Sequence, residues 1–314
     1  MKTDVIIPAY RPGERFLKLV GLLERQTVPV NKIFVVNTQR ESFERLADCD
    51  AFCQAHPKVC LRHIQAEEFD HGGTRDLAAS WSDADILIFM TQDALPADEF
   101  LVERLIGCLL GREDTAAAYA RQLPEKDCGT IERYTRQFNY PDRSAYRTKA
   151  DLPVLGIKTY FCSNVCAAYR REVFERLGGF VKQTIFNEDM IFAARAVQAG
   201  YSIGYAADAR VIHSHNYTGR EQFSRNFDLG VSHAQYPEIF DAVPPEGEGK
   251  KLVAQTAAYL VRRAPWLLPR LVWQSGMKWL GYKLGRGYER LPRRLVRAFS
   301  MQKKYWNDAR FFTK

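Results

Sequence analysis

Short apolar runs alternate with amphipathic segments along the first third of the chain. The continuous apolar runs predict four buried strands, at residues 4–8, 32–36, 59–64 and 85–90. The segments between them carry apolar residues at helical spacing and predict helices at residues 14–26, 42–55, 74–81 and 98–110. Ser42 is the expected N-cap of the second helix, and Pro57 ends it. This alternation indicates an α/β fold with a mostly parallel central sheet covered on both faces.

The pattern becomes irregular after Thr115. It predicts two long loops, a helix and two short strands, at residues 124–128, 139–152, 187–200, 203–206 and 209–213. From Gly219 the spacing is helical, and a break is expected around Pro237, Pro244 and Pro245. We therefore predict an α/β domain at residues 1–235 and a helical region at residues 236–314.

Composition excludes several classes of protein. With 46% hydrophobic and 26% charged residues, the chain of 314 residues is globular and not disordered. No uncharged apolar run approaches the roughly 18 residues of a membrane-spanning helix, and the N-terminus lacks the apolar core of a signal peptide. Seven cysteines at uneven spacing indicate reduced structural thiols, not a disulfide framework or a zinc site. We expect a cytoplasmic protein.

Charge is distributed unevenly along the chain. There are 45 Lys and Arg against 37 Asp and Glu, a net charge of +8. From Lys250 onward, 16 basic residues face two acids, so this end carries +14 and the rest of the chain −6. Four of the five tryptophans lie in the same basic end, at positions 266, 273, 279 and 306.

Three clusters of polar residues follow predicted strands or begin predicted helices. Asp93 lies just past an apolar strand, where a carboxylate can bind a hard cation or can simply begin the next helix. Gly72, Gly73 and Arg75 suit an anion at a helix start, although a turn capped by Thr74 is the simpler interpretation.

The third cluster combines acids and histidines. Glu188 and Asp189 begin a predicted helix, where carboxylates are favoured by the helix dipole alone. His213 and His215 are two residues apart on a strand and point to the same face. Together with Asp93, these histidines predict a mixed His/Asp site for Mn²⁺ or Mg²⁺.

Together these clusters resemble family 2 glycosyltransferases of the inverting GT-A type. DVIIPAYRPGERFLKLVGLLERQT resembles the family's first nucleotide-binding strand and helix, and FDHGGTRD with ILIFMTQDALP resembles its rhamnosyltransferase-like branch. CSNVCAAYRREVFERLGGF and FNEDMIFAARAVQAGY resemble the acceptor-side and catalytic-acid motifs. The resemblance covers about residues 3–235. It implies a GT-A nucleotide-sugar-binding fold, here followed by a helical basic extension.

The resemblance implies roles for individual residues. Asp189 corresponds to the catalytic base, with Glu188 beside it. Asp93 corresponds to the second carboxylate of the metal-binding Asp-x-Asp motif, His213 to an additional metal ligand, and His215 to its neighbour. The residues expected to contact the donor nucleotide are Pro8, Ala9, Tyr10, Arg11, Asn37, Arg75, Asp76, Gln92 and Asp93.

The sequence departs from the family pattern at three positions. Thr91 replaces the first acid of Asp-x-Asp, so metal coordination is expected to depend on Asp93, His213 and the donor diphosphate. Asn37 stands where an acid usually follows the second strand, and Asp76 stands where Asn is common.

The implied activity is inverting transfer of a sugar from a nucleoside diphosphate. The branch resemblance favours L-rhamnose from dTDP-L-rhamnose, moved to a hydroxyl of a saccharide or lipid-linked saccharide in cell-surface polysaccharide synthesis. Two other functions stay open: a sugar nucleotidyltransferase, which would need a basic loop for a triphosphate, and a non-enzymatic membrane-associated scaffold.

The basic, Trp-rich end suits binding to an anionic surface. Cations alternate there with apolar and aromatic residues, as in helices that lie on an anionic membrane surface. Such a segment can also be a helical cap whose Trp and Leu pack on the body. We expect an enzyme peripheral to the inner face of the cell membrane and no nucleic-acid partner, because no recognition module is visible.

Overall fold

The computed structural model describes residues 1–243 and 246–307, which fall into two compact units. The first unit comprises residues 1–125, 140–183 and 188–214. The second comprises residues 126–139, 184–187 and the described residues from His215 onward. The division into a catalytic domain at residues 1–235 and a helical region at residues 236–314 stays a prediction. The predicted break at Pro244 and Pro245 lies outside the described residues.

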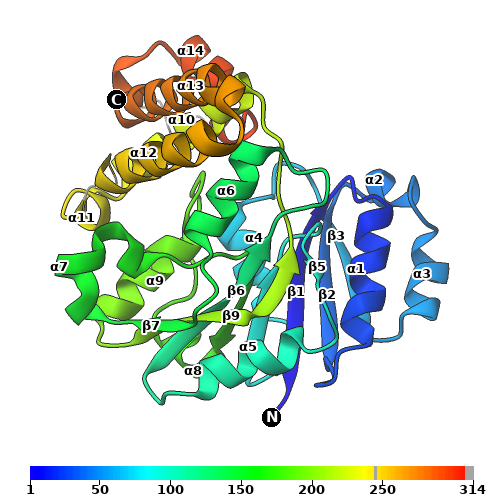
Figure 1. The fold of residues 1–314 in the computed structure, drawn as a ribbon. Helices are drawn as coiled ribbons and strands as arrows, with labels where there is room; N and C mark the ends of the chain where they lie inside the picture. Colours follow the sequence, from blue (N-terminus) through cyan, green and yellow to red (C-terminus); the bar gives the residue numbers. More distant parts are fainter. Residues whose placement is uncertain (244–245, 308–314) are drawn as a thin grey trace. The chain divides into compact units, whose positions relative to one another are not determined.

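A nine-stranded sheet forms the frame of the first unit (Figure 1). Its strands are β1 (Thr3–Tyr10), β2 (Lys32–Thr38), β3 (Val59–Ile64), β4 (Ile86–Met90), β5 (Leu95–Pro96), β6 (Thr115–Leu123), β7 (Ala145–Arg147), β8 (Cys166–Arg170) and β9 (Ser202–Ile212). They lie in the order β3-β2-β1-β4-β8-β6-β9-β5, and β7 pairs with β9. β1, β2, β3 and β4 pair in parallel, as predicted, whereas β8 runs antiparallel to β4 and β6.

Most helices of the first unit lie at predicted segments, although the helix predicted at residues 42–55 is divided in two. The helices are α1 (Glu14–Glu24), α2 (Arg40–Glu44), α3 (Cys49–Ala55), α4 (His71–Ala79), α5 (Leu101–Leu110), α7 (Leu152–Leu155), α8 (Arg171–Arg176) and α9 (Glu188–Gln198). The predicted cap at Ser42 is wrong, because this residue lies inside α2 and Asp48 caps a separate helix, α3.

The two strands predicted after residue 202 form one strand, β9, whose register with β6 shifts between Ala206 and Arg210.

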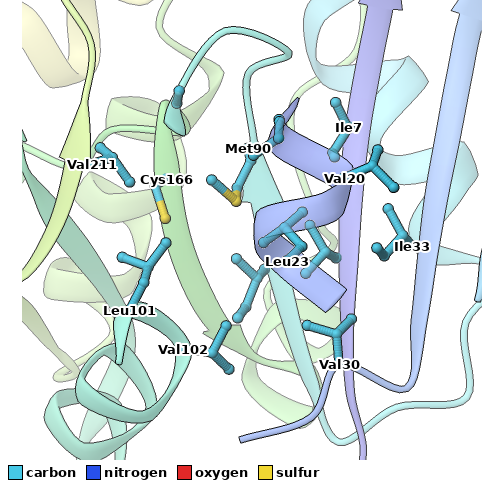
Figure 2. Close-up of a cluster of buried hydrophobic side chains, with 14 of the residues drawn as sticks. Ile7, Val20, Leu23, Val30, Ile33, Met90, Leu101, Val102, Cys166 and Val211 are labelled. Carbon is cyan, nitrogen blue, oxygen red and sulfur yellow. The ribbon is translucent and has the colours of Figure 1, made fainter. Parts of the chain in front are cut away.

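Apolar side chains fill both faces of the sheet because successive strand residues point to opposite sides. On one face, Ile7 and Ile33 pack with Val20 and Leu23 of α1 (Figure 2). On the other, the rings of Phe89, Tyr169 and Phe180 pack edge to face, with centroids 4.9 to 5.4 Å apart. With both faces covered, the strand ends are where polar chemistry can reach solvent.

The second unit is helical. It contains α6 (Thr130–Asn139), α10 (Gly219–Gln235), α11 (Pro237–Phe240), α12 (Glu246–Arg263), α13 (Leu268–Arg286) and α14 (Arg293–Phe299). Helices α10 and α13 touch backbone to backbone, since a Cβ on Gly281 or Gly285 would lie 2.2 or 2.0 Å from a carbonyl oxygen of α10. Of the helices described, none is both long and apolar enough to span a membrane.

Candidate active site

Two side chains fix the strand ends at which the predicted site residues lie. The Gln92 amide binds the backbone of Tyr10 twice, accepting from its N–H at 2.9 Å and donating to its carbonyl at 3.0 Å. Arg15 donates to the carbonyl of Asp93 at 2.6 Å and to that of Ile212 at 2.9 Å. The ends of β1, β4 and β9 are therefore joined, and the backbone is held beside both Asp93 and His213.

The residues predicted to line the nucleoside pocket differ in their exposure. Pro8 is half-buried and Ala9 is buried, whereas Tyr10 and Arg11 are exposed. The Arg11 guanidinium carbon lies 5.0 Å from the centroid of the Tyr10 ring. The backbone of Arg11 has a positive φ of 47°. A non-glycine residue in this conformation is uncommon and typical of functional turns. Asn37 is buried, and its amide nitrogen lies 3.0 Å from both the Gln39 carbonyl and His63 Nδ1.

Gly72 and Gly73, considered above as an anion site, make close contacts within the protein. A Cβ on Gly72 would lie 1.9 Å from the Val181 carbonyl oxygen, so only glycine permits this approach. The Gly73 N–H donates to Asp70 at 2.6 Å, which makes Asp70 the cap of α4 and not Thr74. Asp76 accepts from the Phe180 N–H at 3.0 Å, and burial raises the pKa of its carboxyl group.

Asp93 and His213 of the first unit lie close enough together to bind one divalent cation. Asp93 Oδ2 lies 3.6 Å from His213 Nε2. The helix-start alternative for Asp93 is not realised, because Asp98 accepts the Phe100 N–H just before α5. His215 follows His213 by two residues and begins the second unit.

Gln122 contacts one of the two ring nitrogens of His213. The Gln122 Oε1 lies 3.1 Å from His213 Nδ1. Because an amide oxygen can only accept, this contact favours a proton on Nδ1 and leaves the lone pair of Nε2 facing Asp93. A carboxylate oxygen and an imidazole nitrogen directed at one point fit a divalent cation. Thr91, in place of the first acid, offers no charged ligand.

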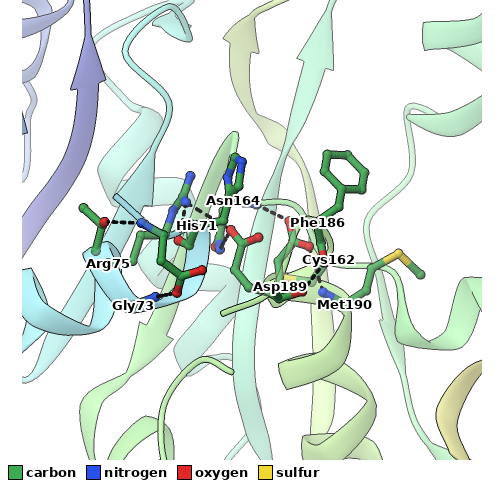
Figure 3. Close-up of polar contacts among 12 residues, drawn as sticks. His71, Gly73, Arg75, Cys162, Asn164, Phe186, Asp189 and Met190 are labelled. Carbon is green, nitrogen blue, oxygen red and sulfur yellow. Dashed lines mark hydrogen bonds and ion pairs between the residues drawn. The ribbon is translucent and has the colours of Figure 1, made fainter. Parts of the chain in front are cut away.

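Glu188 and Asp189 begin α9, and each is held by Asn164 (Figure 3). The Asn164 amide donates to Glu188 at 3.0 Å, and its backbone N–H donates to Asp189 at 2.9 Å. Glu188 also lies 3.1 Å from the Arg75 guanidinium, with both side chains only 7% exposed. Helix α4 is thereby linked to α9 through a buried ion pair.

The environment separates the pKa values of the two acids. Burial would raise the pKa of Glu188, but the Arg75 guanidinium, His71 and the hydrogen bond from Asn164 together outweigh burial and lower this pKa. Burial and the negative charge of Glu188 together raise the pKa of Asp189 to about 7. Glu188 therefore remains a carboxylate, while Asp189 can gain or lose a proton near neutral pH.

Sequence reasoning did not single out Gln122, Ser163 and Asn164. The Gln122 amide nitrogen donates to the Ser163 hydroxyl at 3.0 Å, and Ser163 precedes the residue that holds both acids. A hydrogen-bonded path thus runs from His213 to the segment that binds Glu188 and Asp189. The signal for Asn164 was its place in CSNVCAAYRREVFERLGGF. Gln122 is the last residue but one of β6, a strand whose alanines concealed it in the sequence.

The chain belongs to glycosyl transferase family 2, whose model matches residues 4–178. It is therefore a glycosyltransferase, which confirms the predicted family and removes the nucleotidyltransferase and scaffold alternatives. It is 41% identical over 315 residues to the O-antigen chain rhamnosyltransferase RfbN of Salmonella typhimurium, covering 99% of this chain and 98% of the relative. It is 45% identical over 310 residues to the O-antigen chain rhamnosyltransferase WbaN of Salmonella anatum, covering 98% and 96%.

Solved structures confirm the predicted GT-A fold. The mannosyltransferase PcManGT from Pyrobaculum calidifontis, solved with GDP-Man and Mn²⁺, aligns with a TM-score of 0.58 at 17% identity, covering 97% of this chain and 84% of that one. TarS from S. aureus, solved with UDP-GlcNAc, aligns with a TM-score of 0.54 at 16% identity, covering 97% and 85%.

Replacing Gln122 tests whether it prepares His213 for a metal. Gln122→Leu should weaken Mn²⁺ binding by about 10- to 100-fold, because Nδ1 loses the acceptor that orients the ring. Gln122→Glu keeps an acceptor and should bind Mn²⁺ like the wild type. Electron paramagnetic resonance of free Mn²⁺ measures this without any turnover. The exposed Gln198→Leu is the control, and unchanged Mn²⁺ affinity in Gln122→Leu would exclude this role.

Proposed function

We propose that this protein transfers L-rhamnose from a nucleoside diphosphate, dTDP-L-rhamnose in our assignment, to a hydroxyl group of a saccharide or lipid-linked saccharide. The proposal is supported by two O-antigen chain rhamnosyltransferases that are 41% and 45% identical over nearly the full length. It is further supported by the branch-like motifs around Asp76 and Asp93. The product would enter the synthesis of a cell-surface polysaccharide.

The observation that carries the proposal is the pair of unlike carboxyl groups at the start of α9. Asp189, with a pKa raised to about 7, accepts the proton of the acceptor hydroxyl. The hydroxyl oxygen then bonds to the anomeric carbon as the bond to the diphosphate breaks on the opposite face, which inverts that carbon. Glu188 stays ionised beside Arg75 and keeps the pKa of Asp189 high enough for this work.

The donor diphosphate is proposed to lie at the strand ends that carry Asp93 and His213. These residues, with His215 as the proposed third ligand, would hold Mn²⁺ or Mg²⁺, which neutralises the charge that grows on the leaving diphosphate. Tyr10 and Arg11 are exposed at the neighbouring strand end and are proposed to contact the nucleoside. Asn37, Arg75, Asp76 and Gln92, whose side chains bind protein groups, are proposed to shape the donor site around them.

The second unit is proposed to bring the enzyme to an anionic membrane surface at the inner face of the cell membrane. Trp266, Trp273 and Trp279 are 73%, 62% and 61% exposed, beside the exposed cations Arg263 and Arg270. Exposed tryptophans beside cations are typical of membrane-surface helices. Trp306 does not belong to this face, because it is buried with Phe227 and Val231.

Asp189→Asn tests the catalytic assignment. The amide keeps the shape of the side chain but cannot accept the proton, so rhamnosyl transfer should fall by about 10² or more. Binding of dTDP-L-rhamnose, measured by calorimetry, should remain. The exposed Asp50→Asn is the matched control, and wild-type turnover by the Asp189 variant would remove this residue from the mechanism.

The membrane assignment is tested on the full chain with Trp266→Ser and Trp279→Ser combined. Each tryptophan can bury about 150–250 Å² of surface, so partitioning onto phosphatidylglycerol vesicles should fall at least about tenfold. Val154→Ser, which alters an even more exposed apolar residue of the first unit, should partition like the wild type. Equal flotation of all three proteins would contradict membrane binding through this face.

A further inference from the structure

The second unit contains a polar pocket that the catalytic assignments do not use. It is small, with a cavity volume of about 40 Å³. Its lining includes Thr130, Asn216, Gln222, Arg270, Gln274 and Lys278. The last three are spaced four residues apart and therefore lie on one face of α13. The pocket thus presents several hydrogen-bond donors and two cations.

Lys278 is the most informative of these side chains. It is half-buried, and burial lowers the pKa of its ammonium group. Among the residues that the structure describes, it makes neither a hydrogen bond nor an ion pair. Glu132, the carboxylate in the lining, is already bound to Arg136 at 2.7 Å. A half-buried ammonium group that makes no direct hydrogen bond or ion pair can gain one from a bound anion.

Further positive charge surrounds Lys278. Glu132 attracts its ammonium group, whereas Arg225 and Arg136 repel it. The Arg225 guanidinium lies 4.7 Å from the Phe186 ring and 5.8 Å from the Tyr217 ring, which fixes it beside a lining residue. Four cations, Lys278, Arg136, Arg225 and Arg270, therefore lie in or around the pocket lining, against one acid, Glu132. Convergent cations and amide donors around a small polar cavity suit the oxygens of a phosphate group.

The pocket also has exposed apolar neighbours. Three of its lining residues, Leu267, Gln274 and Lys278, are each next in the chain to an exposed tryptophan. These are Trp266, Trp273 and Trp279. A phosphate site next to exposed indoles fits a ligand with a charged head and a hydrocarbon tail better than it fits a free anion.

We propose that this pocket binds the phosphate of a lipid carrier, with Lys278 as the principal contact and the tail on the tryptophan side. The inference rests on the proposed function, because it assigns the lipid-linked form of the acceptor. His215, which lines the pocket, is two residues from the metal-ligating His213 along the chain. The chain thus passes from the donor's metal ligand into the phosphate pocket within three residues.

Calorimetric binding of three probes to the full chain tests the site. The probes are farnesyl phosphate, farnesol and inorganic phosphate, so that head and tail are varied separately. The wild type should bind farnesyl phosphate at least about tenfold more tightly than either of the others. Lys278→Gln should lose that advantage, Lys278→Arg should keep most of it, and the exposed Lys251→Gln should match the wild type. Melting temperatures confirm that each variant is folded.

Three results would overturn the proposal. Unchanged farnesyl phosphate binding by folded Lys278→Gln would exclude this lysine. Inorganic phosphate bound as tightly as farnesyl phosphate would make the pocket a free-anion site. Farnesol bound as tightly would remove the phosphate contact.

Because the assay needs no transfer, the two proposals can fail separately. Farnesyl phosphate binding without any rhamnosyl transfer would contradict the proposed function and leave the site standing. Rhamnosyl transfer together with unaltered binding by Lys278→Gln would remove the site alone.

Discussion

The buried ion pair between Arg75 and Glu188 is the interaction on which the catalytic arrangement depends. Its atoms lie 3.1 Å apart, and it joins helices α4 and α9, which are more than 100 residues apart in the chain. Removing one partner of such a pair leaves a buried charge and typically costs about 3–5 kcal/mol. The pair is therefore a strong constraint on where α9 begins, and α9 begins with the two acids of the proposed mechanism.

The same pair supplies the electrostatic asymmetry of the site. Arg75 keeps Glu188 ionised, and the resulting negative charge, together with burial, raises the pKa of Asp189. Asn164 donates a hydrogen bond to each acid, which fixes the position of both carboxyl groups. At the proposed metal site, Arg15 and Gln122 have a similar effect, because they fix the backbone of Asp93 and the ring of His213. Reactive groups are thus fixed by partners that do not themselves react.

Much of this arrangement could be predicted from the sequence, because it depends on local pattern. The four parallel strands and their helices were visible as continuous apolar runs and helical spacing, and strand ends marked Asp93 and its neighbours. The strands β6 and β8 were not visible, since TAAAYARQL and CAAYR have small residues and weak apolar character. Ser42 was assigned as a cap because the pattern could not show that Asp48 begins a second helix.

The partners of the site residues could not be predicted, because they depend on contacts between distant segments. Nothing local in the sequence links Arg75 to Glu188, or Gln122 to His213. The glycines at 72 and 73 suggested an anion site, whereas their use is a close approach to Val181 and a cap by Asp70. Sequence patterns therefore identified candidate site residues, but they did not show how each residue is held.

The pH dependence of rhamnosyl transfer in Glu188→Gln tests the central claim most directly. Because the base must be unprotonated, kcat of the wild type should rise with pH through the raised pKa of Asp189, near 7. Glu188→Gln removes the neighbouring negative charge and leaves Arg75 positive, so the rise should move to lower pH. A rise at the same pH, or at a higher one, would contradict the claim that Glu188 sets the proton affinity of Asp189.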